Sequence, residues 1–205
     1  MRSVLLLHGA ASGPWVFEGW AESFQGLEVE AVDLQAGLNV AEAAMSNYAA
    51  VAHRAAELLP RPLALCGWSM GGLVAMMVAG RCGASALVLL EPSPPGEVQG
   101  FDAAIELVTG TYDGRDVYGS FPAGVASRPE SSLARAERRR GVSVPALPCP
   151  ALVVYGDEFS DERGRKLAAH YGAEEQYLAG HDHWQLVLGT RGREAVGGSL
   201  SRVLP

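Results

Sequence analysis

Short apolar segments alternate with segments of helical periodicity along most of this chain, and this alternation constrains the fold more than any other feature. The apolar segments mostly end at Gly or Pro, as buried parallel strands do. Buried strands of this kind are predicted at residues 3–9, 62–67, 86–92 and 151–156. Residues 26–34 alternate and then turn apolar, which favours an edge strand, and residues 173–180 are also predicted as a strand. Helical spacing occurs over residues 39–60, 70–83, 161–172 and 190–204. The alternation predicts an α/β fold with a mostly parallel sheet of about six strands and helices on both faces.

Residues 96–148 interrupt this alternation, because they separate two predicted buried strands by about fifty residues. Most connections in compact domains are only a few residues long. The interval contains helical patterns at 101–110 and 131–140 together with many Gly and Pro residues. We interpret it as a small lid or cap inserted over the strand ends of a single domain that spans residues 1–205.

The composition disfavours several classes of protein. A chain of 205 residues that is 48% hydrophobic and 19% charged fits one soluble globular domain. The net charge of −7 disfavours a nucleic-acid partner. No apolar segment is long enough for a signal peptide or a membrane helix, so we expect a cytoplasmic protein without a membrane partner. The oligomeric state stays open.

Cysteine and arginine usage adds two expectations. The three Cys residues have neither CxxC nor His-rich spacing, which disfavours a disulfide framework and a structural zinc site. We therefore expect no metal and no cofactor. The triplet Arg138-Arg139-Arg140 ends a charged helical pattern. It is interpreted by default as a solvated helix face, with an anion site as the alternative.

A serine lies between glycines where a predicted strand meets a predicted helix, in the segment ALCGWSMGGLVAMMVAG at residues 64–80. Ser69 is the centre of a Gly-x-Ser-x-Gly pattern at residues 67–71, which is short enough to occur by chance. The strand-to-helix context gives it meaning, because a sharp turn there exposes the serine and needs glycines in its crowded flanks. We interpret Ser69 as a nucleophile.

Reactive side chains follow five of the predicted strands at their carboxyl ends. Open parallel sheets bind their ligands at that edge, so these side chains are expected to lie near one another. They are His8, Ser69, Glu91, Asp157, His181 and His183.

This arrangement resembles the α/β-hydrolase family over essentially the whole chain, as a trimmed version that lacks the family's first two strands. Residues 5–20, LLLHGAASGPWVFEGW, are similar to the His-Gly loop of plant-type methyl-esterase and hydroxynitrile-lyase relatives. The resemblance implies that the backbone N–H groups of Ala10 and Met70 form an oxyanion hole, and that His8 holds the loop. Three aromatic residues of this stretch either pack a helix, which we favour, or line an acyl pocket: Trp15, Phe17 and Trp20.

The general base is one of two histidines within AGHDHWQLVLG, residues 179–189. The family often shows Gly-His, which favours His181. It also shows a histidine followed by an aromatic residue and an apolar stretch, and His183 fits that pattern along more of its length. We therefore select His183 as the base, with His181 as a rim residue or hydrogen-bonding neighbour.

The acid departs from the family's usual pattern of Gly-x-x-Asp, because Phe159 stands where the aspartate is expected. Some relatives, haloalkane dehalogenases among them, place the acid after the preceding strand, where this chain has Glu91. A carboxylate at a buried strand end needs a partner, and His183 would provide one. We favour Glu91 and keep Asp157 as the alternative. The remaining possibilities are Glu158, Asp161 or no acid at all.

The resemblance implies a serine hydrolase that cleaves a carboxylic ester, thioester or lactone of a small-molecule acyl substrate through an acyl-enzyme. Two alternatives stay open because a fold alone does not determine function. One is a lyase or cyclase that uses the same serine and histidine without an acyl-enzyme. The other is a ligand-sensing protein built on this fold.

Overall fold

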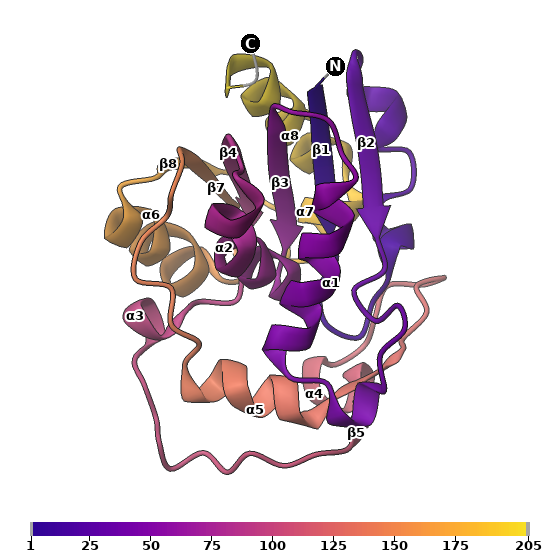
Figure 1. Cartoon of the computed structure of the whole chain (residues 1–205), viewed down its shortest axis with the longest axis vertical. Helices are drawn as coiled ribbons and strands as arrows, with labels where there is room; N and C mark the ends of the chain where they lie inside the picture. Colours follow the sequence, from indigo (N-terminus) through magenta and orange to yellow (C-terminus); the bar gives the residue numbers. More distant parts are fainter. Residues whose placement is uncertain (1, 204–205) are drawn as a thin grey trace.

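Six parallel strands form one sheet in the order β2-β1-β3-β4-β7-β8 (Figure 1). The structure is a computed structural model that describes residues 2–203. Its strands are β1 (Arg2–Leu7), β2 (Leu27–Val32), β3 (Leu63–Trp68), β4 (Ala86–Leu90), β7 (Ala151–Tyr155) and β8 (Glu174–Tyr177). All six predicted strands are confirmed, in an all-parallel sheet. The strand order reverses between β1 and β3, and open α/β sheets bind ligands at such a point.

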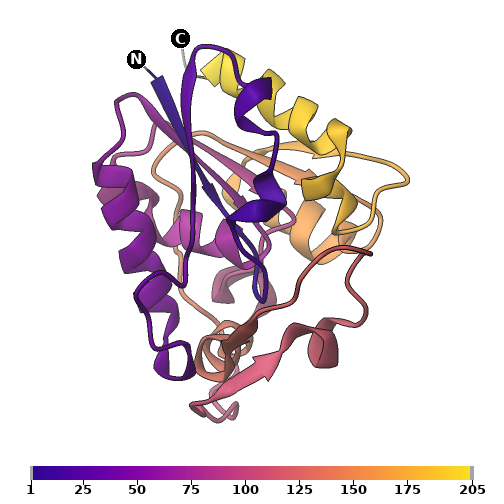
Figure 2. The ribbon, with the colours of Figure 1, turned by 90° about the vertical axis from the view of Figure 1, so that its right-hand side faces the viewer.

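Helices cover both faces of the sheet, as Figure 2 shows along its edge. One face is covered by α1 (Met45–Glu57), α2 (Met70–Cys82) and α6 (Lys166–Tyr171). The other is covered by the short turn η1 (Pro14–Phe17) and by α7 (Gln185–Leu188) and α8 (Thr190–Val203). Three further short turns are η2 (Ala21–Ser23), η3 (Val40–Glu42) and η4 (Ser160–Arg165), the last being π-helical.

The alternation of side chains along the strands divides the core into two layers. In β1, Leu5 and Leu7 pack with the α1 and α2 side, whereas Val4 and Leu6 pack with the α7 and α8 side. Both faces are apolar because helices cover both of them, which is why the strand segments look like continuous apolar runs. The helix predicted over residues 190–204 is α8, and position 204 lies outside the described residues.

The segment between β4 and β7 lies beyond the carboxyl ends of the strands, where the arrowheads point in Figure 1. We call residues 96–148 the insertion. It contains α3 (Gly96–Gln99), β5 (Thr111–Asp113), α4 (Gly114–Tyr118), β6 (Pro129–Ser131) and α5 (Ser132–Arg140). Strands β5 and β6 pair antiparallel, which the sequence did not predict.

The helix predicted at residues 101–110 is wrong, because that segment is irregular. Its large apolar residues Phe101, Leu107 and Val108 are exposed. A helix of this length is marginal unless it buries an apolar face on other elements, and this segment leaves its large apolar side chains mostly exposed. No helix among residues 2–203 has the length and apolar character needed to cross a lipid bilayer.

Candidate active site

Ser69 lies on a strained turn between β3 and α2. Its φ of 55° and ψ of −120° are values that an L-residue rarely adopts. Backbone hydrogen bonds hold the turn: Ser69 N donates to Leu90 O at 3.0 Å, and Ser69 O accepts from Ser93 N at 2.8 Å. The strain is therefore imposed by the neighbouring strand ends, and it places Ser69 in the lining of a cavity.

The two glycines of the pattern leave room for this turn. A Cβ atom on Gly67 would lie 2.3 Å from Gly71 O, and one on Gly71 would lie 2.0 Å from Leu7 O. Both contacts are with backbone atoms, which side-chain rotation does not relieve. The pattern is thus required by the close approach of β1, β3 and α2, as the sequence argument supposed.

His183 contacts a buried carboxylate at the end of β4. The imidazole Nδ1 of His183 lies 2.6 Å from Oε2 of Glu91, and Oε1 of Glu91 accepts from Gly156 N at 2.8 Å. Glu91 is fully buried and its backbone φ is 39°, so the chain turns sharply to hold this side chain. Each carboxylate oxygen thus has a donor, which a buried carboxylate requires.

Aromatic rings enclose the imidazole. The ring centroid of His183 lies 4.9 Å from that of Trp68 and 5.2 Å from that of Phe159. Trp68 Nε1 also donates to His183 O at 3.0 Å, and His183 N donates to Oε2 of Glu158 at 3.1 Å. Burial lowers the pKa of His183, and the hydrogen bond that its ring donates to Glu91 opposes this effect only in part. The imidazole is therefore neutral near pH 7 and able to accept a proton.

Asp157 is not the carboxylate on the histidine. Its carboxylate accepts from the hydroxyl of Tyr177 and, at 3.1 Å, from Gly180 N. Asp157 follows β7 directly, two positions short of Phe159, and this displacement carries its side chain toward the turn after β8. The structure thus places the carboxylate of Asp157 on Tyr177 and Gly180 and not on the imidazole of His183.

The other weighed residues lie elsewhere. Asp161 forms an ion pair with Lys166 at 2.7 Å, and Glu158 contacts the backbone of His183 rather than its ring. His181 directs its Nδ1 to Ala179 O at 3.1 Å. Among the weighed residues, the structure brings together Ser69 and His183 in one cavity lining, with Glu91 on the histidine.

The loop after β1 carries the expected oxyanion donor Ala10, which lines the same cavity, while Met70 opens α2. His8 is fully buried and holds the loop: its Nε2 accepts from Leu34 N at 3.0 Å, and its Nδ1 lies 2.8 Å from Gly9 O. The imidazole of His8 therefore spans two backbone segments and does not reach Ser69's cavity lining.

Glu130 of the insertion also holds this loop, and the sequence analysis missed it. Its carboxylate is fully buried and accepts from Ala11 N at 2.9 Å, from Ser131 N at 2.9 Å and from the Tyr48 hydroxyl. Ala11 has a φ of 57°, so this contact fixes an unusual backbone conformation next to Ala10. In the sequence, the signal for this contact was a glutamate in a stretch with several serines, and no local pattern indicated which residue it would contact.

The cavity beside Ser69 has a volume of about 630 Å³ and is bounded by both the sheet and the insertion. Trp15, Phe17 and Trp20 do not line it and pack in the core under α7 and α8. The solvated interpretation of the Arg triplet is wrong for Arg138, which is buried and lines the cavity. Aromatic and arginine side chains of the insertion contribute much of the lining: Tyr118, Phe121, Arg135, Arg138 and Arg139.

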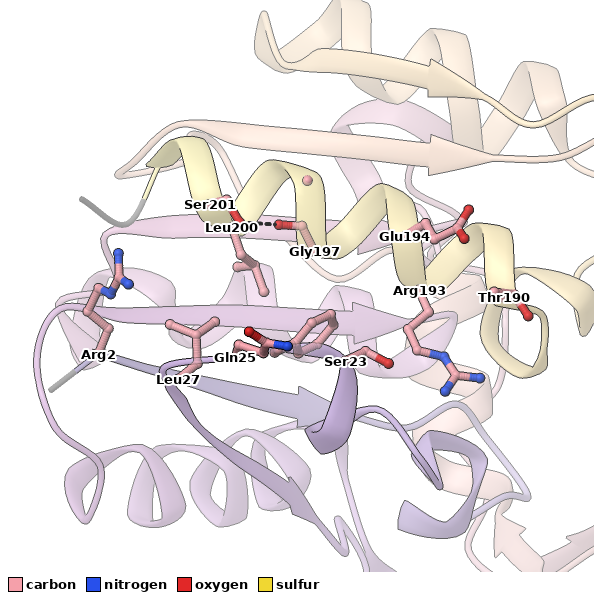
Figure 3. Close-up of a pocket in the computed structure, with 12 residues that line it drawn as sticks. Arg2, Ser23, Gln25, Leu27, Thr190, Arg193, Glu194, Gly197, Leu200 and Ser201 are labelled. Carbon is pink, nitrogen blue, oxygen red and sulfur yellow. Dashed lines mark hydrogen bonds between the residues drawn. The ribbon is translucent and has the colours of Figure 1, made fainter.

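A second cavity, of about 560 Å³, lies between α8 and the beginning of the sheet (Figure 3). Arg2 and Leu27, which line it, are the first residues of β1 and β2. It is thus at the amino ends of the strands, opposite Ser69. No cluster of potential metal ligands occurs within residues 2–203.

The model of the alpha/beta hydrolase family matches residues 4–196, nearly the full chain. The chain belongs to this family. The six-stranded parallel sheet is consistent with a trimmed form of the family's fold. No curated protein sequence matches the chain.

Solved structures of the same fold share little sequence with this family member. A methylesterase from Arabidopsis has a TM-score of 0.72 at 18% identity, covering 100% of this chain and 99% of its own. A tomato methylketone synthase I variant complexed with beta-ketoheptanoate has the same TM-score and identity, covering 98% and 96%. The type II thioesterase from the borrelidin biosynthetic cluster has a TM-score of 0.65 at 18% identity, covering 99% and 91%.

Proposed function

We propose that this protein is a serine hydrolase that cleaves a carboxylic ester, thioester or lactone through an acyl-enzyme. The observation that carries the proposal is the buried contact between Glu91 and His183 at 2.6 Å, next to a serine on a strained strand-to-helix turn. A neutral histidine oriented by a carboxylate beside such a serine is the arrangement that activates a hydroxyl nucleophile.

In the proposed mechanism each group has one role. Glu91 holds Nδ1 of His183, which leaves Nε2 to take the proton of Ser69 as its oxygen attacks the acyl carbon. The N–H groups of Ala10 and Met70 stabilise the negative charge that develops on the carbonyl oxygen. His183 then protonates the leaving group, and water releases the acid in a second, mirrored step.

The surroundings of the base support this mechanism. Trp68 lies at a tilt against the imidazole and Phe159 meets it edge to face, so both rings limit its contact with water and the positive charge that forms during the reaction depends on Glu91. The ion pair between imidazolium and carboxylate is stronger in such a site than in water. The insertion bounds the cavity on the side away from the sheet, as a small cap would.

Esterases and thioesterases among the solved structures of this fold are consistent with the proposal. No structural observation favours the lyase alternative, which would use the same serine and histidine. The two are distinguished by their products, because hydrolysis releases a carboxylic acid and an alcohol or thiol.

The test measures release of p-nitrophenol and of the acid from p-nitrophenyl esters of graded chain length, and of thiol from the matching thioesters. We expect turnover that Ser69→Ala and His183→Ala each reduce by several orders of magnitude, since the groups act as one unit. His181→Ala is the matched control and should stay within roughly tenfold. Activity above about a tenth in Ser69→Ala would refute the assignment.

A further inference from the structure

The cavity beside Ser69 carries more positive than negative side chains. Four arginines and two carboxylates line it: Arg135, Arg138, Arg139 and Arg163, with Glu158 and Asp182. The protein as a whole has a net charge of −7, so this excess of positive charge is local. Chance distribution of surface charge would favour an acidic lining.

The two carboxylates of the lining already have backbone partners. Glu158 accepts from His183 N at 3.1 Å, and Asp182 accepts from Gln185 N at 2.7 Å at the beginning of α7. The ion pairs formed within residues 2–203 involve none of the four arginines. None of the four arginines is therefore held in a direct ion pair by residues 2–203, although Glu91 and Glu158 lie close enough to Arg163 to act on its charge.

Arg163 lies closest to the base. Its guanidinium carbon is 4.0 Å from the centroid of Phe159, whose ring in turn meets His183 edge-on at 5.2 Å. No hydrogen-bond acceptor for the Arg163 side chain is found in residues 2–203. Burial lowers the pKa of Arg163 and the charge of Arg138 acts in the same direction, whereas the carboxylates of Glu91 and Glu158 oppose these two effects in part. An anion in the cavity would relieve both effects.

Two tyrosine hydroxyls of the insertion hold the side chain of Arg138. Only 7% of it is exposed, and its Nη2 donates to the hydroxyls of Tyr112 at 3.3 Å and Tyr118 at 3.2 Å. Its Nε and Nη1 have no acceptor in the described part of the chain. Within residues 2–203, Arg193 Nε is the one side-chain nitrogen or oxygen that is both fully buried and without a hydrogen-bond partner, so Nε and Nη1 of Arg138 are not fully buried. The free nitrogens of Arg138 therefore reach the open space of the cavity.

We propose that this cavity binds an ester or thioester that carries an anionic group, and that Arg163 and Arg138 recognise that group. The inference rests on the proposed hydrolase function and narrows its substrate class. Carboxylate and phosphate oxygens both match the paired N–H groups of a guanidinium. The anion is a carboxylate on the acyl chain or a phosphate on the leaving group.

Two substrate pairs distinguish these sources. Mono-p-nitrophenyl adipate carries a carboxylate on the acyl chain, and p-nitrophenyl hexanoate is its neutral match. Hexanoyl-coenzyme A carries phosphates on the leaving group, and hexanoyl-N-acetylcysteamine is its neutral match. We expect kcat/KM for the anionic member of one pair to exceed that of its match by about tenfold or more at low salt. The advantage should shrink as salt is raised.

Substitutions of the arginines test whether Arg163 and Arg138 recognise the anionic group. Arg163→Gln and Arg138→Gln should each bring the anionic-to-neutral ratio of kcat/KM toward one. The matched control is Arg165→Gln, because Arg165 belongs to the same turn but does not line the cavity. It should leave the ratio unchanged. Circular dichroism and thermal unfolding verify that each variant is folded.

A binding readout keeps the inference separate from the proposed function. The Tm of the Ser69→Ala protein is measured in the presence of one of two anions, monomethyl adipate or coenzyme A, and in the presence of the neutral ester methyl hexanoate. We expect one of the two anions to raise Tm more than the neutral ester does, and adding Arg163→Gln should remove the difference. Ser69-dependent turnover without any charge preference would overturn this inference alone. Absence of turnover together with an Arg163-dependent Tm shift would overturn the hydrolase proposal alone.

Discussion

Replacing Glu91 by Gln tests the assignment of the acid. The carboxylate accepts two hydrogen bonds, from His183 Nδ1 at 2.6 Å and from Gly156 N at 2.8 Å. An amide has one oxygen, so Glu91→Gln leaves one donor facing its NH₂ group. If the oxygen stays on Gly156, the NH₂ group donates to Nδ1 and selects the tautomer in which Nε2 is protonated. That tautomer does not accept the proton of Ser69.

The expected loss follows from the same geometry. The charge centres of imidazolium and carboxylate are roughly 4 Å apart, which at an effective dielectric constant of about 20 corresponds to about 4 kcal/mol. An energy of this size corresponds to a change in rate of about a thousandfold. The tautomer effect increases the loss of kcat toward the factor of roughly 10⁴ that is observed when a triad aspartate is replaced by its amide. We expect kcat for a p-nitrophenyl ester to fall by 10³ to 10⁴, on the order of these estimates.

Asp157→Asn is the matched control, because Asp157 also follows a sheet strand but contacts Tyr177 and Gly180. Its activity should stay within roughly tenfold of the parent. Both variants are compared by kcat and kcat/KM, with thermal unfolding to verify the fold. Near-normal activity of Glu91→Gln, together with a large loss in Asp157→Asn, would refute the reasoning.

Three further results are expected. Because burial lowers the pKa of His183 below its usual 6.5 and the base must be neutral, the acidic limb of kcat/KM should have its midpoint below pH 6.5; a limb centred above 7 would contradict this. Glu130→Gln should lower the free energy of unfolding by about 1–3 kcal/mol, since one buried donor loses its acceptor, and should also reduce kcat; an unchanged Tm and kcat would show that the contact is dispensable. Gly71→Ala should strongly lower Tm because its Cβ would lie 2.0 Å from the backbone of β1, whereas Gly198→Ala, with nothing within 4 Å, should not.

The parallel sheet could be predicted from the sequence because its four central strands, β1, β3, β4 and β7, are buried on both faces and are therefore short apolar runs that end at Gly or Pro. The edge strands β2 and β8 are partly exposed and have a weaker apolar pattern. The turn at Ser69 was equally visible, because the crowding around Gly67 and Gly71 admits only glycine. These features depend on local sequence.

The insertion could not be predicted in the same way. Residues 101–110 have helical periodicity but form an irregular segment that leaves Phe101 and Leu107 exposed. The buried position of Arg138 depends on the hydroxyls of Tyr112 and Tyr118, which are far from it in sequence. Such tertiary contacts leave no periodic signal.

The candidate site lies between these cases. Phe159 in the usual place of the aspartate indicated that the acid had moved, and a glutamate ending a buried strand indicated where. That Glu91 contacts His183, and not another side chain, depends on tertiary structure. So does the contact between Glu130 and the loop of Ala11, which joins segments far apart in the chain.

The acyl-enzyme is the intermediate on which the account depends most directly. Wild-type protein is mixed with an excess of a p-nitrophenyl ester, quenched in acid during the first turnover, and analysed by intact and peptide mass spectrometry. We predict a burst of p-nitrophenol equal to the enzyme concentration and one acyl group on the peptide that contains Ser69, with neither in Ser69→Ala. Steady turnover with an unmodified Ser69, or an acyl group on another residue, would contradict the account.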